Sequence, residues 1–265
     1  MYQFNYYKAK SLADAVQRLS ASGDARLLAG GQTLIAAMKL RLAAPSDVVD
    51  LRDVAELRGI RNDGKNLVIG AMARHGEVAS SGEAQAIPAL RVLASGIGDR
   101  MVRNMGTLGG SVANNDPAAD YPAAVLGLGA TVATNKRKVA ADQFFTGMYE
   151  TALEPGEIIT SVSFPVPKRA GYAKFKNPAS RYAIVGVFVA DFGSMVRVAV
   201  TGAAPCVFRA AEMEKALAKN FSADAVAKVA VAADKLNSDI HAGAEYRAHL
   251  VTVMTRRAVE QALAA

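Results

Sequence analysis

The chain contains few of the residues that several common kinds of functional site require. Its 265 residues include one cysteine, Cys206, three histidines and no tryptophan. One cysteine excludes an internal disulfide, and it excludes an iron–sulfur cluster bound by four thiolates of this chain. His75, His241 and His249 lie in separate contexts, and none is beside a serine or cysteine nucleophile motif. We therefore expect no catalytic triad, and we expect each histidine to be a surface or capping residue.

Long hydrophobic runs are also missing. The first residues, Met1 to Lys8, show no basic segment followed by an apolar one, so no secretory signal is visible. The longest apolar run near the middle, Ala183 to Ala190, ends at Asp191 and is far too short to span a bilayer. We expect a cytoplasmic protein without membrane insertion, and the lack of disulfides fits a reducing compartment.

Positive charge is in excess but is not concentrated. Lys and Arg number 31 against 24 Asp and Glu, which gives a net charge of +7. The densest basic cluster is Lys136-Arg137-Lys138, which we interpret as a solvated turn. Zinc-finger spacing, a ribonucleoprotein motif and a basic tail are all absent, so we expect no nucleic-acid binding. The excess charge is suited to a partner protein or an anionic cofactor.

The hydrophobic content of 51% predicts a sizeable core, and the pattern along the chain predicts three units. Residues 1–56 are expected to form an α/β unit and residues 57–169 a second, α+β unit. Residues 170–265 are expected to form a C-terminal α+β unit, with strands first and helices after. Helices are expected at 11–19, 33–40, 77–80, 89–96, 210–219, 223–236 and 245–263. The first is expected to open with a capping box, Ser11-Leu12-Ala13-Asp14, in which the serine caps the helix. Strands are expected at 25–29, 47–51, 157–164, 172–176, 184–191 and 195–201, at the end of 125–132, and in a hairpin turning at Asn62-Asp63-Gly64.

Two glycine-rich segments are the most informative feature that is present. The first reads Leu27-Leu28-Ala29-Gly30-Gly31-Gln32-Thr33-Leu34, and the second reads Thr107-Leu108-Gly109-Gly110-Ser111. Because glycine has no Cβ, a ligand can approach its backbone closely, and consecutive exposed N–H groups form a site for anions. Two such turns in one chain suggest a ligand with two linked phosphates, such as a dinucleotide. Neither segment is a Walker A loop or a Rossmann fingerprint, and tight packing alone also accounts for paired glycines.

Small and polar residues follow the second segment. They include Asn114, Asn115, Asp116 and Asp120. Carboxylates suit the hydroxyl groups of a ribose rather than phosphate; a series of Asx turns is the alternative. A divalent metal bound by Asp116 and Asp120 would lack further oxygen ligands at a recognisable spacing, so no metal site is expected.

Two lysines alternate on one predicted strand, Lys174 and Lys176. Lysines on an edge strand are usually solvated. A lysine beside a flavin would instead favour negative charge on the reduced ring.

Together these motifs resemble those of the FAD-binding medium subunit of molybdenum hydroxylases, the xanthine dehydrogenase and carbon monoxide dehydrogenase family. The family's Ala-Gly-Gly-His/Gln-Ser/Thr stands here at residues 29–33, followed by Met38-Lys39-Leu40-Arg41. Its Thr-Ile/Leu-Gly-Gly stands at residues 107–110, and its Asn-Asp-Pro-Ala-Ala-Asp at residues 115–120. The resemblance covers essentially the whole chain. It implies an α+β protein with a two-part FAD-binding fold of the PCMH/vanillyl-alcohol-oxidase type and a C-terminal domain like that of CO dehydrogenase flavoproteins.

The resemblance also implies the residues that contact FAD. Residues 27–34 and 107–111 would wrap the pyrophosphate, and Asp120 would be the acidic contact. Ile159 would contact the cofactor through its backbone, and Lys176 would lie near the isoalloxazine ring. Tyr182 matches a tyrosine that shields the ring in some members, and Ile97 lies where some members stack an aromatic residue on adenine.

The implied function is electron transfer. In this family two 2Fe–2S clusters belong to a small partner subunit and molybdopterin to a large one, commonly in a heterohexamer. Electrons would pass from the clusters through FAD in this chain to an external acceptor, so that no catalytic base or nucleophile is needed here. A stand-alone flavoprotein oxidoreductase of the same fold and a scaffold subunit that has lost FAD are the alternatives.

Overall fold

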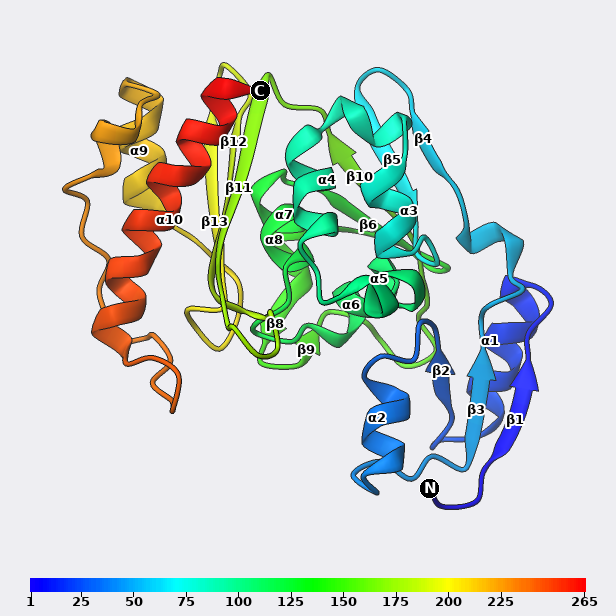
Figure 1. Ribbon diagram of the computed structural model, residues 1–265. Helices are drawn as coiled ribbons and strands as arrows, with labels where there is room; N and C mark the ends of the chain where they lie inside the picture. Colours follow the sequence, from blue (N-terminus) through cyan, green and yellow to red (C-terminus); the bar gives the residue numbers. More distant parts are fainter.

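A parallel three-stranded sheet organises the first part of the chain. In the computed structural model, which describes residues 1–265, strands β1 (Asn5–Lys8), β3 (Asp47–Asp50) and β2 (Arg26–Leu28) lie in that order. Helices α1 (Leu12–Ala21) and α2 (Leu34–Lys39) connect them. The predicted cap of α1 is confirmed, since the Ser11 hydroxyl accepts a hydrogen bond of 3.1 Å from the Asp14 N–H. This unit projects at the lower right of Figure 1.

A five-stranded antiparallel sheet organises the second part. Its order is β4 (Ile60–Asn62), β5 (Asn66–Gly70), β10 (Ile159–Pro165), β6 (Thr131–Thr134) and β7 (Lys138–Ala140). The hairpin predicted at Asn62-Asp63-Gly64 is confirmed. Asn62 Oδ1 accepts from the Gly64 N–H at 2.9 Å, and Gly64 has a φ of 85°, which suits glycine.

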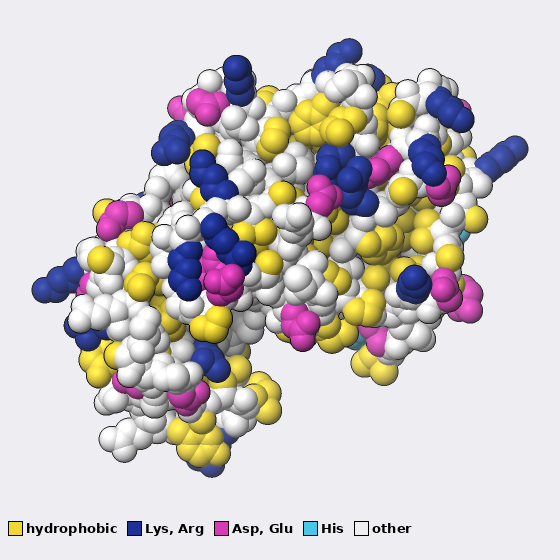
Figure 2. All heavy atoms as spheres, turned by 180° about the vertical axis from the view of Figure 1, so that it is seen from behind, with side chains coloured by type: hydrophobic (Ala, Val, Ile, Leu, Met, Phe, Trp, Pro, Cys, Tyr) yellow, Lys and Arg dark blue, Asp and Glu magenta, His cyan; other side chains and the backbone are white.

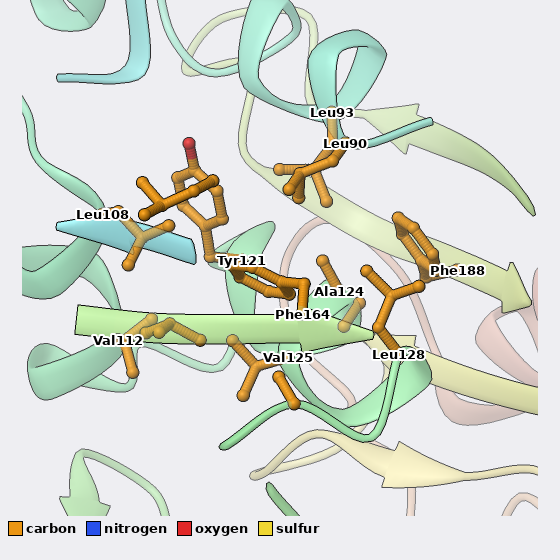
Figure 3. Packing of buried hydrophobic residues seen from close by; sticks show 14 of the residues in the cluster. Leu90, Leu93, Leu108, Val112, Tyr121, Ala124, Val125, Leu128, Phe164 and Phe188 are labelled. Atoms are coloured by element: carbon orange, nitrogen blue, oxygen red, sulfur yellow. The ribbon is translucent and has the colours of Figure 1, made fainter. Parts of the chain in front are cut away.

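Short helices and the main core accompany this second sheet. The helices are α3 (His75–Ser80), α4 (Pro88–Ser95), α5 (Arg100–Met105), α6 (Leu108–Asn114), α7 (Tyr121–Gly127) and α8 (Ala141–Phe144), and a small hairpin adds β8 (Phe145–Gly147) and β9 (Glu150–Thr151). Figure 3 shows Leu90 and Leu93 from α4, Tyr121 and Val125 from α7 and Phe164 from β10 converging on one core. The apolar stretch 125–132 begins as the end of α7 and reaches β6, the strand predicted at its end.

The last part of the chain is an antiparallel sheet covered by a long helix. The order is β11 (Arg169–Lys176), β12 (Ala183–Asp191), β13 (Val196–Thr201) and β14 (Phe208–Arg209). Helix α10 (Ala244–Ala264) packs on β11 and β12, and α9 (Ala211–Lys219) packs on β13, both on the left side in Figure 1. Helices α4 and α7 contact the same sheet from the second unit. The whole is an α+β fold, as predicted.

One predicted helix is wrong. Between α9 and α10, only a 3₁₀ turn over Ala223–Val226 forms within the predicted helix 223–236. Val226, Val229 and Val231 pack on the C-terminal core, and these contacts hold an irregular segment rather than one helical face. None of the helices has the length and apolar character needed to cross a membrane.

Candidate functional site

The first glycine segment joins β2 to α2 and offers unpaired donors. The backbone N–H groups of residues 29–34 donate no hydrogen bond to any acceptor in the chain. Gly31 has a φ of 72°, and a Cβ there would lie 2.6 Å from Ile35 Cδ1. Free N–H groups at a turn of this kind form a site for an anion. The side chains of Leu27, Leu28 and Leu34 pack into cores of the first unit, so their contribution to a ligand would come from the backbone.

The two glycine segments meet, although they belong to different units of the fold. A Cβ on Gly30 would overlap the Met105 carbonyl oxygen and lie 2.7 Å from Gly106 Cα. A Cβ on Gly110 would lie 3.5 Å from Ala29 Cβ. Glycine at position 30 therefore permits the close approach of the two segments.

The second segment differs from the expected turn, because Gly109 and Gly110 lie inside α6. Their N–H groups are already used: Gly109 donates to the Ala71 carbonyl at 2.8 Å and Gly110 to the Thr107 hydroxyl at 3.2 Å. A Cβ on Gly109 would lie 2.6 Å from Ala71 Cβ. We expected both segments to expose free backbone N–H groups, and for Gly109 and Gly110 this expectation is wrong. The groups left without an acceptor here are the Thr107 N–H and the Ser111 hydroxyl.

An arginine-lined cleft lies beside both segments. It has a volume of about 380 Å³ and is lined by Ala29 and Thr107 together with Arg52, Arg58 and Arg74. The Arg74 guanidinium makes no ion pair, and the Arg52 guanidinium lies 3.6 Å from Asp50. Figure 2 shows that the basic side chains on the opposite face of Figure 1 are spread in separate groups, with acidic side chains beside many of them. Three arginines in the lining of one cleft supply positive charge that suits an anionic ligand.

Asp120 is buried and paired with a lysine. Lys174 Nζ lies 2.8 Å from Asp120 Oδ1, and the side chains are 8% and 5% exposed. The Tyr172 hydroxyl also donates to Asp120 Oδ1. Burial raises the pKa of Asp120, while Lys174 acts in the opposite direction. A buried carboxylate held in this way is compatible with the predicted acidic contact.

Lys174 is buried, although lysines on an edge strand are usually solvated. Besides Asp120, its Nζ donates to the Gly96 carbonyl at 2.9 Å and to the Arg181 carbonyl at 3.1 Å. Lys174 thereby links Asp120 to Gly96, which precedes Ile97, and to Arg181, which precedes Tyr182. Lys176 is exposed at the end of β11, beyond a shift in strand register, and contacts none of these groups. The alternation of the two lysines along the strand does not predict which of them is buried, because burial depends on how β11 packs against α4.

Ile159 and Tyr182 belong to different sheets of the fold. Ile159 is the first residue of β10 and is 5% exposed. The Thr160 carbonyl after it accepts from the Ala71 N–H, and the Ala71 carbonyl accepts from Gly109, so Ile159 is one strand away from α6. Tyr182 is 49% exposed, in the turn between β11 and β12.

His75 is not the surface residue that we expected. It is 5% exposed, and its ring packs 5.3 Å from that of Tyr121. A Cβ on Gly106 would lie 2.6 Å from His75 Nε2, and the His75 N–H donates to the Gly106 carbonyl at 3.0 Å. Burial, with Arg103 nearby, lowers the pKa of His75 to about 4. The neutral imidazole therefore packs directly against Gly106, which Gly30 also approaches.

Comparison with known proteins identifies the family of the chain. Residues 2–167 match the family described as the FAD binding domain in molybdopterin dehydrogenase, and residues 170–262 match the CO dehydrogenase flavoprotein C-terminal domain. The carbon monoxide dehydrogenase medium chain of Afipia carboxidovorans is 41% identical over 98% of this chain and 97% of its own length. The glyceraldehyde dehydrogenase medium chain of Sulfolobus acidocaldarius is 33% identical over 98% of each chain.

A solved structure shows the same fold. The structure of reconstituted CO dehydrogenase from Oligotropha carboxidovorans superimposes with a TM-score of 0.91 and 38% identity, over 99% of this chain and 98% of the other. The chain therefore belongs to the FAD-binding medium subunits of molybdenum hydroxylases, the oxidoreductase family of xanthine dehydrogenase and carbon monoxide dehydrogenase.

Proposed function

We propose that this chain holds FAD at the junction of the two glycine segments, within a complex of three kinds of subunit. A small partner subunit would carry the 2Fe–2S clusters, and a large one would carry molybdopterin and hydroxylate the substrate. When bound, FAD supplies the chemistry of accepting electrons from the clusters and delivering them to an external acceptor. The observation that carries this proposal is the run of unpaired N–H groups at residues 29–34, directly beside Gly106 and Gly110.

Each part of the site has a proposed task. The N–H groups of residues 29–34 bind the pyrophosphate, assisted by the Thr107 N–H and the Ser111 hydroxyl. Arg52, Arg58 and Arg74 offset the phosphate charge from the adjoining cleft. The residues taken from the family pattern are Asp120, Ile159, Lys176 and Tyr182, with Ile97 in place of the aromatic residue of some members. We add Lys174, because it holds Asp120 and the turn that carries Tyr182.

The chain needs no base or nucleophile of its own for this task. Its residues bind and orient the cofactor and exclude water from part of it. We further propose that three kinds of subunit assemble as a dimer of heterotrimers. The substrate pocket would lie in the large subunit, so that the names of the relatives, which cover carbon monoxide and glyceraldehyde, assign no substrate to this chain.

The test is the visible absorption spectrum of the purified chain, alone and co-expressed with its partner subunits, with the released cofactor identified by chromatography. We expect flavin bands from FAD and no iron–sulfur absorption from the chain alone. Gly30→Ala should abolish FAD retention, because its Cβ would force the glycine segments apart. Gly82→Ala is the matched control, since Gly82 has a φ of −64° and no neighbour within 4 Å of an added Cβ. If Gly30→Ala retains FAD as Gly82→Ala does, the assignment of the phosphate site is wrong.

A further inference from the structure

Asp50 is a buried acidic residue at the edge of the first sheet, and the proposed function leaves it without a role. It is the last residue of β3, the central strand (Figure 1), and is 0% exposed. In the register of the sheet it pairs with Lys8 and Leu28, which end the two flanking strands. Because the three strands are parallel, Asp50 lies at their carboxyl edge, where ligands of open α/β sheets bind. The first glycine segment leaves the sheet at this same edge.

Two hydrogen bonds fix the Asp50 carboxylate. Its Oδ2 accepts from the Tyr6 hydroxyl at 2.6 Å, and its Oδ1 accepts from the Arg52 backbone N–H at 2.8 Å. Burying a carboxylate is costly unless its oxygens are paired. Both oxygens of Asp50 have a donor, so the side chain is held in one orientation.

A third contact of Asp50 is an ion pair with the Arg52 side chain. The guanidinium lies 3.6 Å from Asp50 Oδ2, and the arginine side chain is 52% exposed. The same side chain lines the arginine-lined cleft, beside Ala29 of the first glycine segment and Thr107 of the second. One end of this ion pair is therefore buried in the sheet, and the other end borders the candidate phosphate site.

Among the three arginines of the cleft, Arg52 is the one that pairs with a carboxylate. Arg58 donates to the Arg52 backbone carbonyl, and Arg74 makes no ion pair. The other acidic residue in the lining, Glu77, accepts from the Arg74 backbone N–H at 2.8 Å and pairs with no guanidinium. Since like charges in one cleft repel each other, an arginine without a partner would turn toward solvent. Asp50 opposes this for Arg52.

We propose that Asp50 is a positioning residue of the phosphate site, which holds the Arg52 guanidinium toward the cleft before the anionic cofactor binds. This rests on the proposed function, which puts the phosphates of FAD beside this cleft. A side chain that is already ordered loses less conformational entropy on binding. Asp50 therefore strengthens binding, although its charge has the same sign as that of the ligand. Tyr6 assists by fixing the carboxylate from β1.

The experiment is a double-mutant cycle on FAD affinity, with the chain in complex with its partner subunits and its FAD reversibly removed. The dissociation constant is measured by titration at low and at high salt. We expect Asp50→Asn and Arg52→Gln each to raise this constant several-fold at low salt, and less at high salt because salt screens exposed charges. Asp50→Asn in the Arg52→Gln background should raise it no further, because Asp50 acts through Arg52.

Tyr6→Phe tests the same inference with a milder change. It removes one hydrogen bond of Asp50 and keeps both members of the ion pair. It should raise the dissociation constant less than Asp50→Asn does, and it should have no effect in the Arg52→Gln background. Tyr2→Phe, at a tyrosine that is 53% exposed in the same unit, is the matched control and should equal the unmodified chain.

The outcomes separate this inference from the proposed function. If the unmodified chain binds FAD and Asp50→Asn binds it equally tightly, or more tightly because a negative charge is lost, the inference is overturned and the proposed function stands. Effects of Asp50→Asn and Arg52→Gln that multiply in the double variant overturn it as well. Should Asp50→Asn fail to fold, equal affinities of Tyr6→Phe and Tyr2→Phe overturn it. If the unmodified chain takes up no FAD even with its partners, the proposed function fails and the inference fails with it.

Discussion

The two glycine segments carry similar sequences but differ in what their backbones do. In the first, the amides of residues 29–34 have no acceptor in the chain. In the second, Gly109 and Gly110 donate to Ala71 and Thr107 within the second unit. Paired glycines thus have two different structural consequences. One segment leaves backbone donors free, and the other permits tight packing against Ala71.

The largest expected effect is a dependence of the unfolding free energy on pH, which arises from His75, the residue that packs against Gly106 just before the second segment. The folded-state pKa of His75 is about 4, below the ordinary 6.5. Between these values the unfolded chain binds a proton that the folded chain does not, so the free energy of unfolding falls as the pH falls from 6.5 to 4. The full difference is about 3 kcal/mol. Urea unfolding at several pH values should show it.

His75→Gln isolates this effect from the titration of carboxylates. The variant lacks the imidazole, so the difference in unfolding free energy between it and the unmodified chain should shrink steadily from pH 7 to pH 4. A difference that stays constant over this range would mean that His75 is solvated, and that Gly106 is not supported by a neutral ring.

Gly109→Ala should reveal the packing role of the second segment. Its Cβ would lie 2.6 Å from Ala71 Cβ and 2.8 Å from the Ala71 carbonyl oxygen. Overpacking against backbone costs about 1–3 kcal/mol, so the apo chain should unfold at lower urea concentration. Gly82→Ala should stay within about 0.5 kcal/mol. If the apo forms of Gly109→Ala and Gly82→Ala were equally stable, the second segment would not depend on tight packing at Gly109, and the difference between the two segments would be lost.

A pair of threonine variants gives the smallest and most selective effect. Thr107 caps α6 by accepting from Gly110, whereas Thr33 begins α2 without a hydrogen bond from its side chain. Thr107→Ala should therefore lower apo stability by about 1 kcal/mol, and Thr33→Ala should leave it within about 0.5 kcal/mol. FAD titration should show little change for Thr33→Ala, because the substitution keeps the backbone N–H of residue 33. If Thr33→Ala lowered the stability of the apo chain more than Thr107→Ala does, the difference described between the two segments would be wrong.

Local signals in the sequence predicted local features well. The serine cap of α1 and the hairpin at Asn62-Asp63-Gly64 each depend on residues within a few positions, and both are confirmed. The short helices α5, α6 and α7 were not predicted. Each has six or seven residues, too few to show a helical period, and packing in the main core stabilises them.

Burial was harder to predict than secondary structure. Lys174 and Lys176 alternate on one strand, yet Lys174 reaches buried Asp120 and Lys176 is exposed. The helix predicted at 223–236 failed for a related reason, since its valines are held by contacts with other elements.

The order of short motifs along the chain was enough to predict the family and the fold class, which the comparisons confirm, and to suggest the segments that we propose hold the cofactor. The three-dimensional arrangement was needed to learn which groups in those segments are free to act. The Gly109 N–H is not free for a ligand, because it donates to the carbonyl of Ala71, which is far away in sequence. Lys174 is buried where it pairs with Asp120. Hydrogen-bond partners and burial are properties of neighbours in space, and no pattern within a short stretch of sequence specifies them.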